Sequence, residues 1–257
     1  MFTTQFPNFQ KGRILKREML ENLRDVPRDF LDLYFQEYSN GIITGVNLHV
    51  NGTTLIVTKG IVKQGNRLYI LQNDFELPYF PTGKETVLKI RFTEELNSPD
   101  FTIFSSEIML DDLDELAENE LELGRFKLKP GAKLRTDYID FADFATEFNT
   151  INSIHCQYAG LYKSTFHPMI LHYFAREMLK SKPSNAYDIS FALECLNQER
   201  MQREVIDYYI SNRLGLEYKE YTNLEIHKYL GRILLEVQSG VRMAAHNPGR
   251  PKRLIVD

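Results

Sequence analysis

The chain has 257 residues, of which 43% are hydrophobic and 26% are charged, and its formal net charge is −4. This length allows one large domain or two of ordinary size. No apolar run approaches the roughly 20 residues that a membrane-spanning helix needs. The acidic balance disfavours nonspecific nucleic-acid binding by the whole chain, because attraction to phosphates requires concentrated Lys and Arg.

The first 40 residues predict a helical N-terminal arm. Apolar residues recur at helical spacing in residues 14–25 and 28–39, and Pro27 is expected to separate two helices. Asn40-Gly41 is suited to a left-handed cap of the second helix. The first 20 residues contain no charged segment followed by an apolar one, so no signal peptide is expected.

Residues 41–135 predict an antiparallel β-sandwich or small barrel. The period falls to about two there, and β-branched and aromatic residues dominate. Asn51-Gly52 is a strong hairpin signal. Residues 86–93, 101–110 and 121–138 extend the pattern. Glycine weakens a strand, so its frequency here indicates tight turns, which we assign to Gly41, Gly45, Gly52, Gly60, Gly65 and Gly131.

An acidic segment, residues 111–122, has seven acids and no base. A calcium loop needs an oxygen ligand at its third position and Gly at its sixth. These positions hold Leu113 and Leu116, so a solvated acidic loop or short helix is the favoured interpretation.

Residues 136–246 predict an α-helical bundle. Helices are expected over residues 168–180, 184–198, 199–214 and 224–245, and Thr222 with Glu225 forms a capping box for the last. An earlier stripe at three- and four-residue steps predicts another helix, whose apolar face either joins an intramolecular core or forms an oligomer or partner interface. Its candidate interface residues are Phe141, Phe144, Phe148 and Ile151, with His155 next in the spacing.

No catalytic, cofactor or metal site is predicted. A mixed metal site of Cys156, His167, His172 and Cys195 is disfavoured because C-x-x-C and H-x-x-x-H spacings are missing. Cys156 and His155, adjacent on the expected helix, would point in different directions. Glu85 and Lys89 lack the preceding Asp of a nuclease pattern, and phosphate-binding glycine motifs are absent. A hydrolase or nuclease is therefore the third choice. The two cysteines indicate a reducing, cytoplasmic setting rather than a disulfide framework.

Residues 247–257 predict a basic flexible tail. The segment from Gly249 to Arg253 resembles the core of an AT-hook, in which Arg250, Lys252 and Arg253 would contact a narrow minor groove. The favoured interpretation is a tail that only a neighbour orders. Nucleic acid is accordingly an unlikely partner.

The strand and turn order resembles the attachment domains of phage tail-fibre and baseplate proteins, at Gly41, Gly45, Gly60, Gly65, Leu123, Gly124, Pro130 and Gly131. A β-domain followed by helices is also similar to the TssK-like baseplate adaptors of type VI secretion systems. The resemblance implies a structural adaptor that docks on a baseplate and bridges to another component. It also implies protein partners and a homo-oligomer, with a trimer favoured, assembled into a virion or tail-like particle. A DNA-associated protein that uses the basic tail is the alternative.

Overall fold

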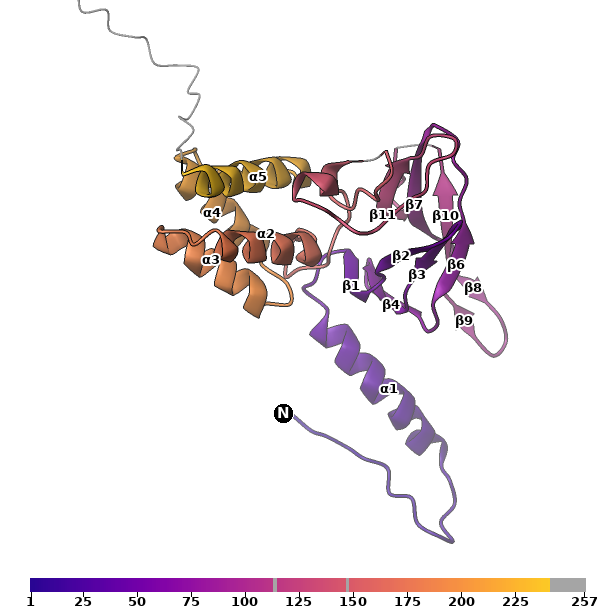
Figure 1. Ribbon diagram of the computed structural model, residues 1–257. Helices are drawn as coiled ribbons and strands as arrows, with labels where there is room; N and C mark the ends of the chain where they lie inside the picture. The colour runs from indigo at the N-terminus through magenta and orange to yellow at the C-terminus, as the bar shows by residue number, and fades with distance from the viewer. Residues whose placement is uncertain (113–114, 147, 241–257) are drawn as a thin grey trace, which may run out of the picture.

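The computed structural model describes residues 1–112, 115–146 and 148–240 (Figure 1). The order of elements confirms the predicted α+β class: one N-terminal helix, then antiparallel strands, then a group of helices. Figure 1 shows the strands and the later helices side by side, with the first helix projecting away from both.

The N-terminal arm contains one helix, α1 (Arg17–Tyr34), rather than the expected two. Pro27 lies inside it. Proline already has a helical φ and removes a single backbone donor, so a helix can continue through it at a cost of about 3 kcal/mol. The expected cap at Asn40-Gly41 is also wrong, because the helix ends at Tyr34 and Gly41 begins the first strand.

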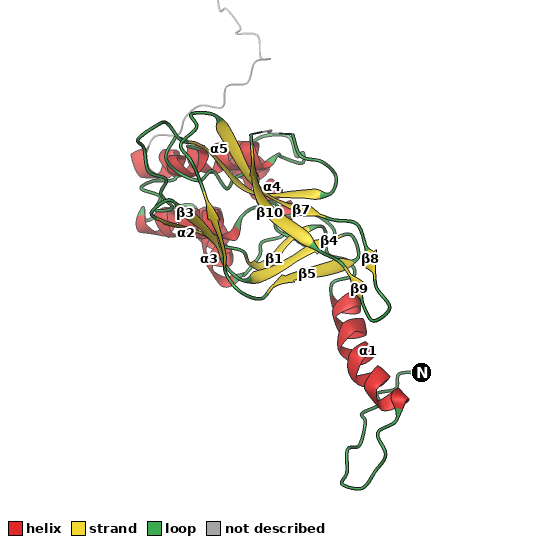
Figure 2. Ribbon diagram, turned by 90° about the vertical axis from the view of Figure 1, so that its right-hand side faces the viewer, coloured by secondary structure: helices red, strands yellow, loops and turns green. Residues whose placement is uncertain are grey.

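The β-part consists of three three-stranded antiparallel sheets and a small two-stranded ribbon (Figure 2). The sheet orders are β1-β4-β5, β2-β3-β6 and β10-β7-β11, and β8 pairs with β9. The strands are β1 (Gly41–Gly45), β2 (Leu48–Asn51), β3 (Thr54–Val57), β4 (Gly60–Gln64), β5 (Arg67–Leu71), β6 (Phe75–Pro78), β7 (Glu85–Phe92), β8 (Leu96–Asn97), β9 (Thr102–Ile103), β10 (Ser106–Asp111) and β11 (Glu120–Lys127).

Two apolar cores hold these sheets together. The larger joins β1 and β4 to β7 and β11, with Ile42, Val62 and Leu88 among its buried members. The smaller lies around Leu55 and Phe126. Burial against facing sheets explains why these strands alternate less strictly than a strand exposed on one face would.

The acidic segment ends in a strand, which corrects part of its expected loop or helix. Glu120 and Glu122 belong to β11 and pair with β7 opposite Arg91 and Lys89. The cations of β7 therefore draw the last acids of the segment into the sheet, since opposite charges on neighbouring strands stabilise pairing.

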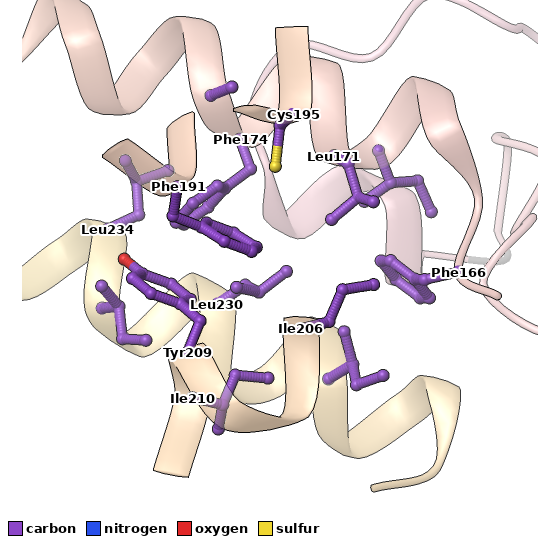
Figure 3. Packing of buried hydrophobic residues seen from close by; sticks show 14 of the residues in the cluster. Phe166, Leu171, Phe174, Phe191, Cys195, Ile206, Tyr209, Ile210, Leu230 and Leu234 are labelled. Carbon is purple, nitrogen blue, oxygen red and sulfur yellow. The ribbon is translucent and has the colours of Figure 1, made fainter. Parts of the chain in front are cut away.

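The helical part contains α2 (Pro168–Lys180), α3 (Ala186–Asn197), α4 (Arg203–Leu214) and α5 (Asn223–Ser239) around its own core. Figure 3 shows aromatic and aliphatic side chains from these helices meeting in that core, with Phe191 facing Tyr209. Their rings stack with centroids 3.8 Å apart. The capping box of Thr222 and Glu225 is confirmed at the start of α5.

The helix expected around residues 141–155 is wrong. Among the described residues of this range, the chain forms a 3-10 turn, η1 (Ala142–Ala145), followed by short bridges to other segments. Asp143 accepts from the Ile139 N–H, and Asp140 accepts from the Asp143 N–H. Such side-chain hydrogen bonds compete with the helical pattern.

The predicted stripe is consequently divided. Phe141 and Phe144 lie in the helical core, Ile151 lies in the smaller β-core, and Phe148 is 57% exposed. Since the first three are buried within one chain, they present no free face to a partner.

The candidate turn glycines occupy two kinds of position. Gly52, Gly65 and Gly131 have positive φ and open space where a side chain would begin, whereas Gly41, Gly45 and Gly60 lie where another backbone comes close. At Gly45, φ is +67° and an added Cβ would lie 2.1 Å from the Lys59 carbonyl oxygen. Both the backbone angle and the space therefore require glycine there.

We expect Gly45→Ala to lower the free energy of unfolding by about 3 kcal/mol or more, because strain at positive φ adds to a backbone clash. Gly52→Ala is the matched control, with positive φ but no clash, and should cost about 1 kcal/mol. Urea unfolding followed by circular dichroism measures both. Equal losses would contradict the close-approach explanation.

Candidate functional site

The β-part and the helical part are joined by residues 150–165, here called the connector. On its β side, Asn152 and Arg125 exchange two backbone hydrogen bonds of 2.8 and 2.9 Å. Further along, the Ile42 N–H donates to Gln157, and the Ala159 N–H donates back to Ile42, both at 2.9 Å. The connector thus adds backbone pairing to both β1 and β11.

Side chains from the helical part bind the same connector. The Asn223 amide donates to the carbonyls of Ile154 and Cys156, at 2.8 and 3.1 Å. Arg200 donates to the carbonyl of Ala159 at 2.9 Å. Because the connector is held on both sides, the two parts have a defined relative orientation.

Two glycines that carry the resemblance to attachment domains, Gly41 and Gly124, allow the connector to pack closely against β1 and β11. A Cβ on Gly41 would lie 2.6 Å from the Gln157 carbonyl oxygen, and one on Gly124 would lie 2.7 Å from Ile151 Cγ2. Sequence reasoning assigns Gly41 to a turn. The residue that a side chain at this position would meet, Gln157, is more than 100 residues away in the sequence. Local spacing carries no signal for such a contact.

Of the two residues in the rejected nuclease pattern, Lys89 belongs to a buried ion-pair network, whereas Glu85 pairs with Arg125. Lys89, whose side chain is 2% exposed, lies 2.8 Å from Asp111 and 2.9 Å from Glu120. Burial lowers the pKa of Lys89, but hydrogen bonds to both carboxylates outweigh this effect and raise the pKa. Burial likewise opposes a net lowering of the pKa of Glu120, which results from Lys89, the Ala117 N–H and Arg91. The Lys89 ammonium group therefore lies between the carboxylates of Asp111 and Glu120.

The cysteines and histidines considered for a metal site lie in different environments. Cys156 is in the larger β-core, where burial raises the thiol pKa, whereas Cys195 is in the helical core, where burial raises its pKa to about 12. Burial lowers the pKa of His167 to about 3, so its ring is neutral beside Tyr158. In the described part of the chain, no three His, Cys, Asp or Glu side chains gather as metal ligands would.

An isolated buried acid lies on α4. Asp207 is 1% exposed, and neither carboxylate oxygen has a hydrogen-bond partner of good geometry within the described ranges. Burial raises its pKa to about 6, although the charge of Arg203 and the Tyr221 N–H both act to lower it.

An exposed apolar surface lies on α1, which has no buried residue. Phe30 and Leu33 are 63% and 72% exposed. We define the α1 stripe as the apolar residues on one side of this helix, namely Met19, Leu20, Leu23, Val26, Phe30, Leu33 and Tyr34. Sequence reasoning finds the helical periodicity but does not identify the stripe as a surface, because periodicity is the same for a face that packs on a core.

A second apolar surface is a hollow of about 700 Å³ between β5 and β10. Both strands lie at the edge of their sheets. Its walls are mainly apolar and include Leu68, Ile70, Phe75, Phe104, Ile108 and Met109. Such a surface can bind apolar side chains, but it lacks converging groups for acid-base or nucleophilic chemistry among these lining residues.

The remaining candidate residues, Arg250, Lys252 and Arg253, lie outside the described residues, as does the predicted tail. Every helix in the described ranges is too short or too polar to cross a bilayer.

No protein-family model matches the sequence, and no curated protein matches it. Among solved structures, the chain is similar to a crystal structure of TssK, with 10% identity, a TM-score of 0.44, and coverage of 92% of this chain and 69% of that one. It is also similar to a chain of a type VI secretion system TssK-TssF-TssG baseplate subcomplex determined by cryo-electron microscopy. That match has 10% identity and a TM-score of 0.36, and covers 91% of this chain and 100% of that one. A TM-score below 0.5 does not establish a shared fold.

We expect Lys89→Met to cost about 3 kcal/mol at pH 7, because it removes the buried cation that Asp111 and Glu120 share and leaves Glu120 with Arg91 alone. The pKa of Glu120 is lowered in the folded protein, so the stability from this group is present above its unfolded pKa and is lost as the pH falls. The cost of the variant should therefore shrink near pH 4. Lys84→Met, at an exposed lysine 3.8 Å from Asp112, is the control and should change stability by less than about 0.5 kcal/mol. Denaturant unfolding at both pH values measures these costs, and equal costs would contradict the assignment.

The stability contributed by Asp207 depends on pH in the opposite direction to that of Glu120. A raised pKa means that the folded state holds the proton more tightly, so stability is greatest below the unfolded pKa and falls as the pH rises through about 6. Asp207→Asn should therefore stabilise the protein by about 1–2 kcal/mol at pH 8 and have little effect at pH 4. Glu204→Gln, at an exposed acid on the same helix, should show no such pH dependence. Thermal melts across this range test the prediction, and destabilisation of Asp207→Asn at pH 8 would refute it.

Proposed function

We propose that this chain is a structural adaptor of a phage-like tail or contractile injection apparatus, which docks on a baseplate and bridges to another component. The observation that carries this proposal is the connector. It fixes two separately cored parts to each other through backbone and side-chain hydrogen bonds. A protein whose task is to hold components at a defined geometry needs such a rigid junction.

The composition of the surfaces supports the same proposal. Both α1 and the hollow between β5 and β10 expose apolar residues, and exposed apolar patches commonly mark protein contacts. Cys195 lies in the helical core, and His167 lies buried in the wall of a hollow of about 240 Å³ beside Cys156 and Tyr158. Burial keeps these groups uncharged, because it raises the pKa of both thiols and lowers the pKa of His167 to about 3. We therefore propose a role without catalysis and without a cofactor.

We keep the division of the chain that the sequence predicts, with the connector counted in the helical bundle. We propose a helical arm over residues 1–40, an attachment domain over 41–135, a helical bundle over 136–246 and a tail over 247–257. The turn and strand order resembles phage attachment domains, and the β-domain followed by helices resembles baseplate adaptors. These resemblances further support protein partners, a homo-oligomer with a trimer favoured, and assembly from the cytoplasm into a particle.

The proposal predicts that the tagged chain copurifies from its source cells with tail or baseplate proteins, and that electron microscopy of this material shows particles that carry the tag. A tagged cytosolic protein of similar mass is the control. Deletion of the gene should leave incomplete particles, and the wild-type gene should restore them. Recovery of the chain without any particle, together with intact particles after deletion, would refute the proposal.

A further inference from the structure

The α1 stripe has the spacing of a coiled coil. Met19, Leu23, Val26, Phe30 and Leu33 follow one another at steps of four, three, four and three residues. This is the a/d pattern of a heptad repeat, in which Leu23 and Phe30 take the a positions. Helices with this repeat pack seam to seam with other helices, because each apolar side chain enters a gap on the facing helix.

Alone, α1 is poorly stabilised. It has 18 residues, contains Pro27 and buries no side chain. An isolated helix of this length is marginal in water, and an interior proline costs about 3 kcal/mol more. A partner that covers the stripe would supply the missing stabilisation.

The stripe is extensive enough for such a partner. Its members Leu20, Leu23, Val26, Phe30, Leu33 and Tyr34 are each between 42% and 72% exposed. A contiguous exposed apolar patch on a helix commonly marks a contact with another protein.

The charges of α1 favour a protein partner over a lipid surface. The helix carries the acids Glu18, Glu21, Asp25, Asp29 and Asp32 against only three arginines, and ion pairs such as Arg17–Glu21, at 2.7 Å, lie along its polar side. Helices that lie on anionic membranes are instead rich in Lys and Arg on that side. A mixed polar face suits contact with water on the outside of a helical bundle.

Residues 37–39, which follow the C-terminal end of α1, are bound to the body of the protein and fix the direction of the helix. The Tyr162 N–H donates to the Glu37 carbonyl at 2.7 Å, the Ser39 N–H donates to Gly160 at 2.9 Å, and Lys63 donates to the Tyr38 carbonyl at 2.7 Å. The helix therefore projects from a fixed place on the body (Figure 2). Identical copies of the chain would present the stripe in the same way. That is the condition for a symmetric contact between identical chains.

We propose that the α1 stripe is a self-association surface, covered by the α1 stripes of other copies of this chain in a short helical bundle. The proposal does not depend on the adaptor function. It also differs from the sequence-based expectation of an oligomer or partner interface at Phe141, Phe144, Phe148 and Ile151, since all of these side chains except Phe148 are buried within one chain.

Light scattering after size exclusion tests the proposal on the full chain. The wild type should have a mass that is a multiple of about 30 kDa, and the double variant Leu23→Glu with Phe30→Glu should have the mass of one chain. The control Glu21→Gln with Arg28→Gln changes the polar side of the same helix and should keep the wild-type mass. Because α1 lies outside the cores, the near-ultraviolet circular dichroism of all three proteins should agree. A monomeric wild type, or an oligomer that the stripe variant leaves intact, would overturn the proposal.

Cross-linking gives an independent measurement of the same contact. Under mild oxidation, Val26→Cys should form disulfide-linked copies, because position 26 lies in the seam, whereas Arg28→Cys on the polar side should not. The native thiols of Cys156 and Cys195 are buried and give no background. Equal cross-linking at positions 26 and 28 would show that the copies do not meet through the stripe.

Discussion

The structure depends on the backbone pairing of the connector with two different sheets. Without the paired hydrogen bonds of Asn152 and Ile42, the connector would leave buried N–H and carbonyl groups unsatisfied, at a cost of a few kcal/mol each. With them, the same segment also presents carbonyl groups to Asn223 and Arg200 of the helical part. One stretch of chain therefore completes the β-cores and sets the position of the helices.

The sheet β10-β7-β11 shows how charge can specify the register of strands inside an otherwise apolar structure. Lys89 reaches both Asp111 on β10 and Glu120 on β11, so a single side chain links the three strands. The Arg125 guanidinium adds a second set of pairs, to Glu122 at 2.7 Å and to Glu85 at 2.8 Å. A slip of one residue in β10 would move Asp111 to the opposite face, and a slip in β11 would move Glu120, so the buried Lys89 would lose a partner in either case.

Sequence periodicity predicts the class, most strands and the helices α2 to α5. Local signals also mark some helix ends, since Asn185 and Thr222 cap α3 and α5 and Gly215 ends α4. Periodicity fails where distant contacts override local preference. The region around Phe141 has helical spacing, yet Asp140 and Asp143 bind nearby backbone groups and Asn152 pairs with Arg125. Similarly, the role of Gly41 beside Gln157 depends on a contact that no local motif encodes. The α1 stripe is visible as a pattern, but a pattern alone cannot distinguish a face that packs inward from one that awaits another chain.

The attachment of α1 has a mechanical consequence. Force applied along this helix would enter the body at residues 37–40, where bonds to Tyr162, Gly160 and Lys63 share it. Bonds loaded in parallel resist more than the same bonds broken in turn, so a pull on the arm would be carried into β4 and the connector together. The C-terminal end of the helix is thus anchored to the body at several points, rather than joined to it by a single flexible segment.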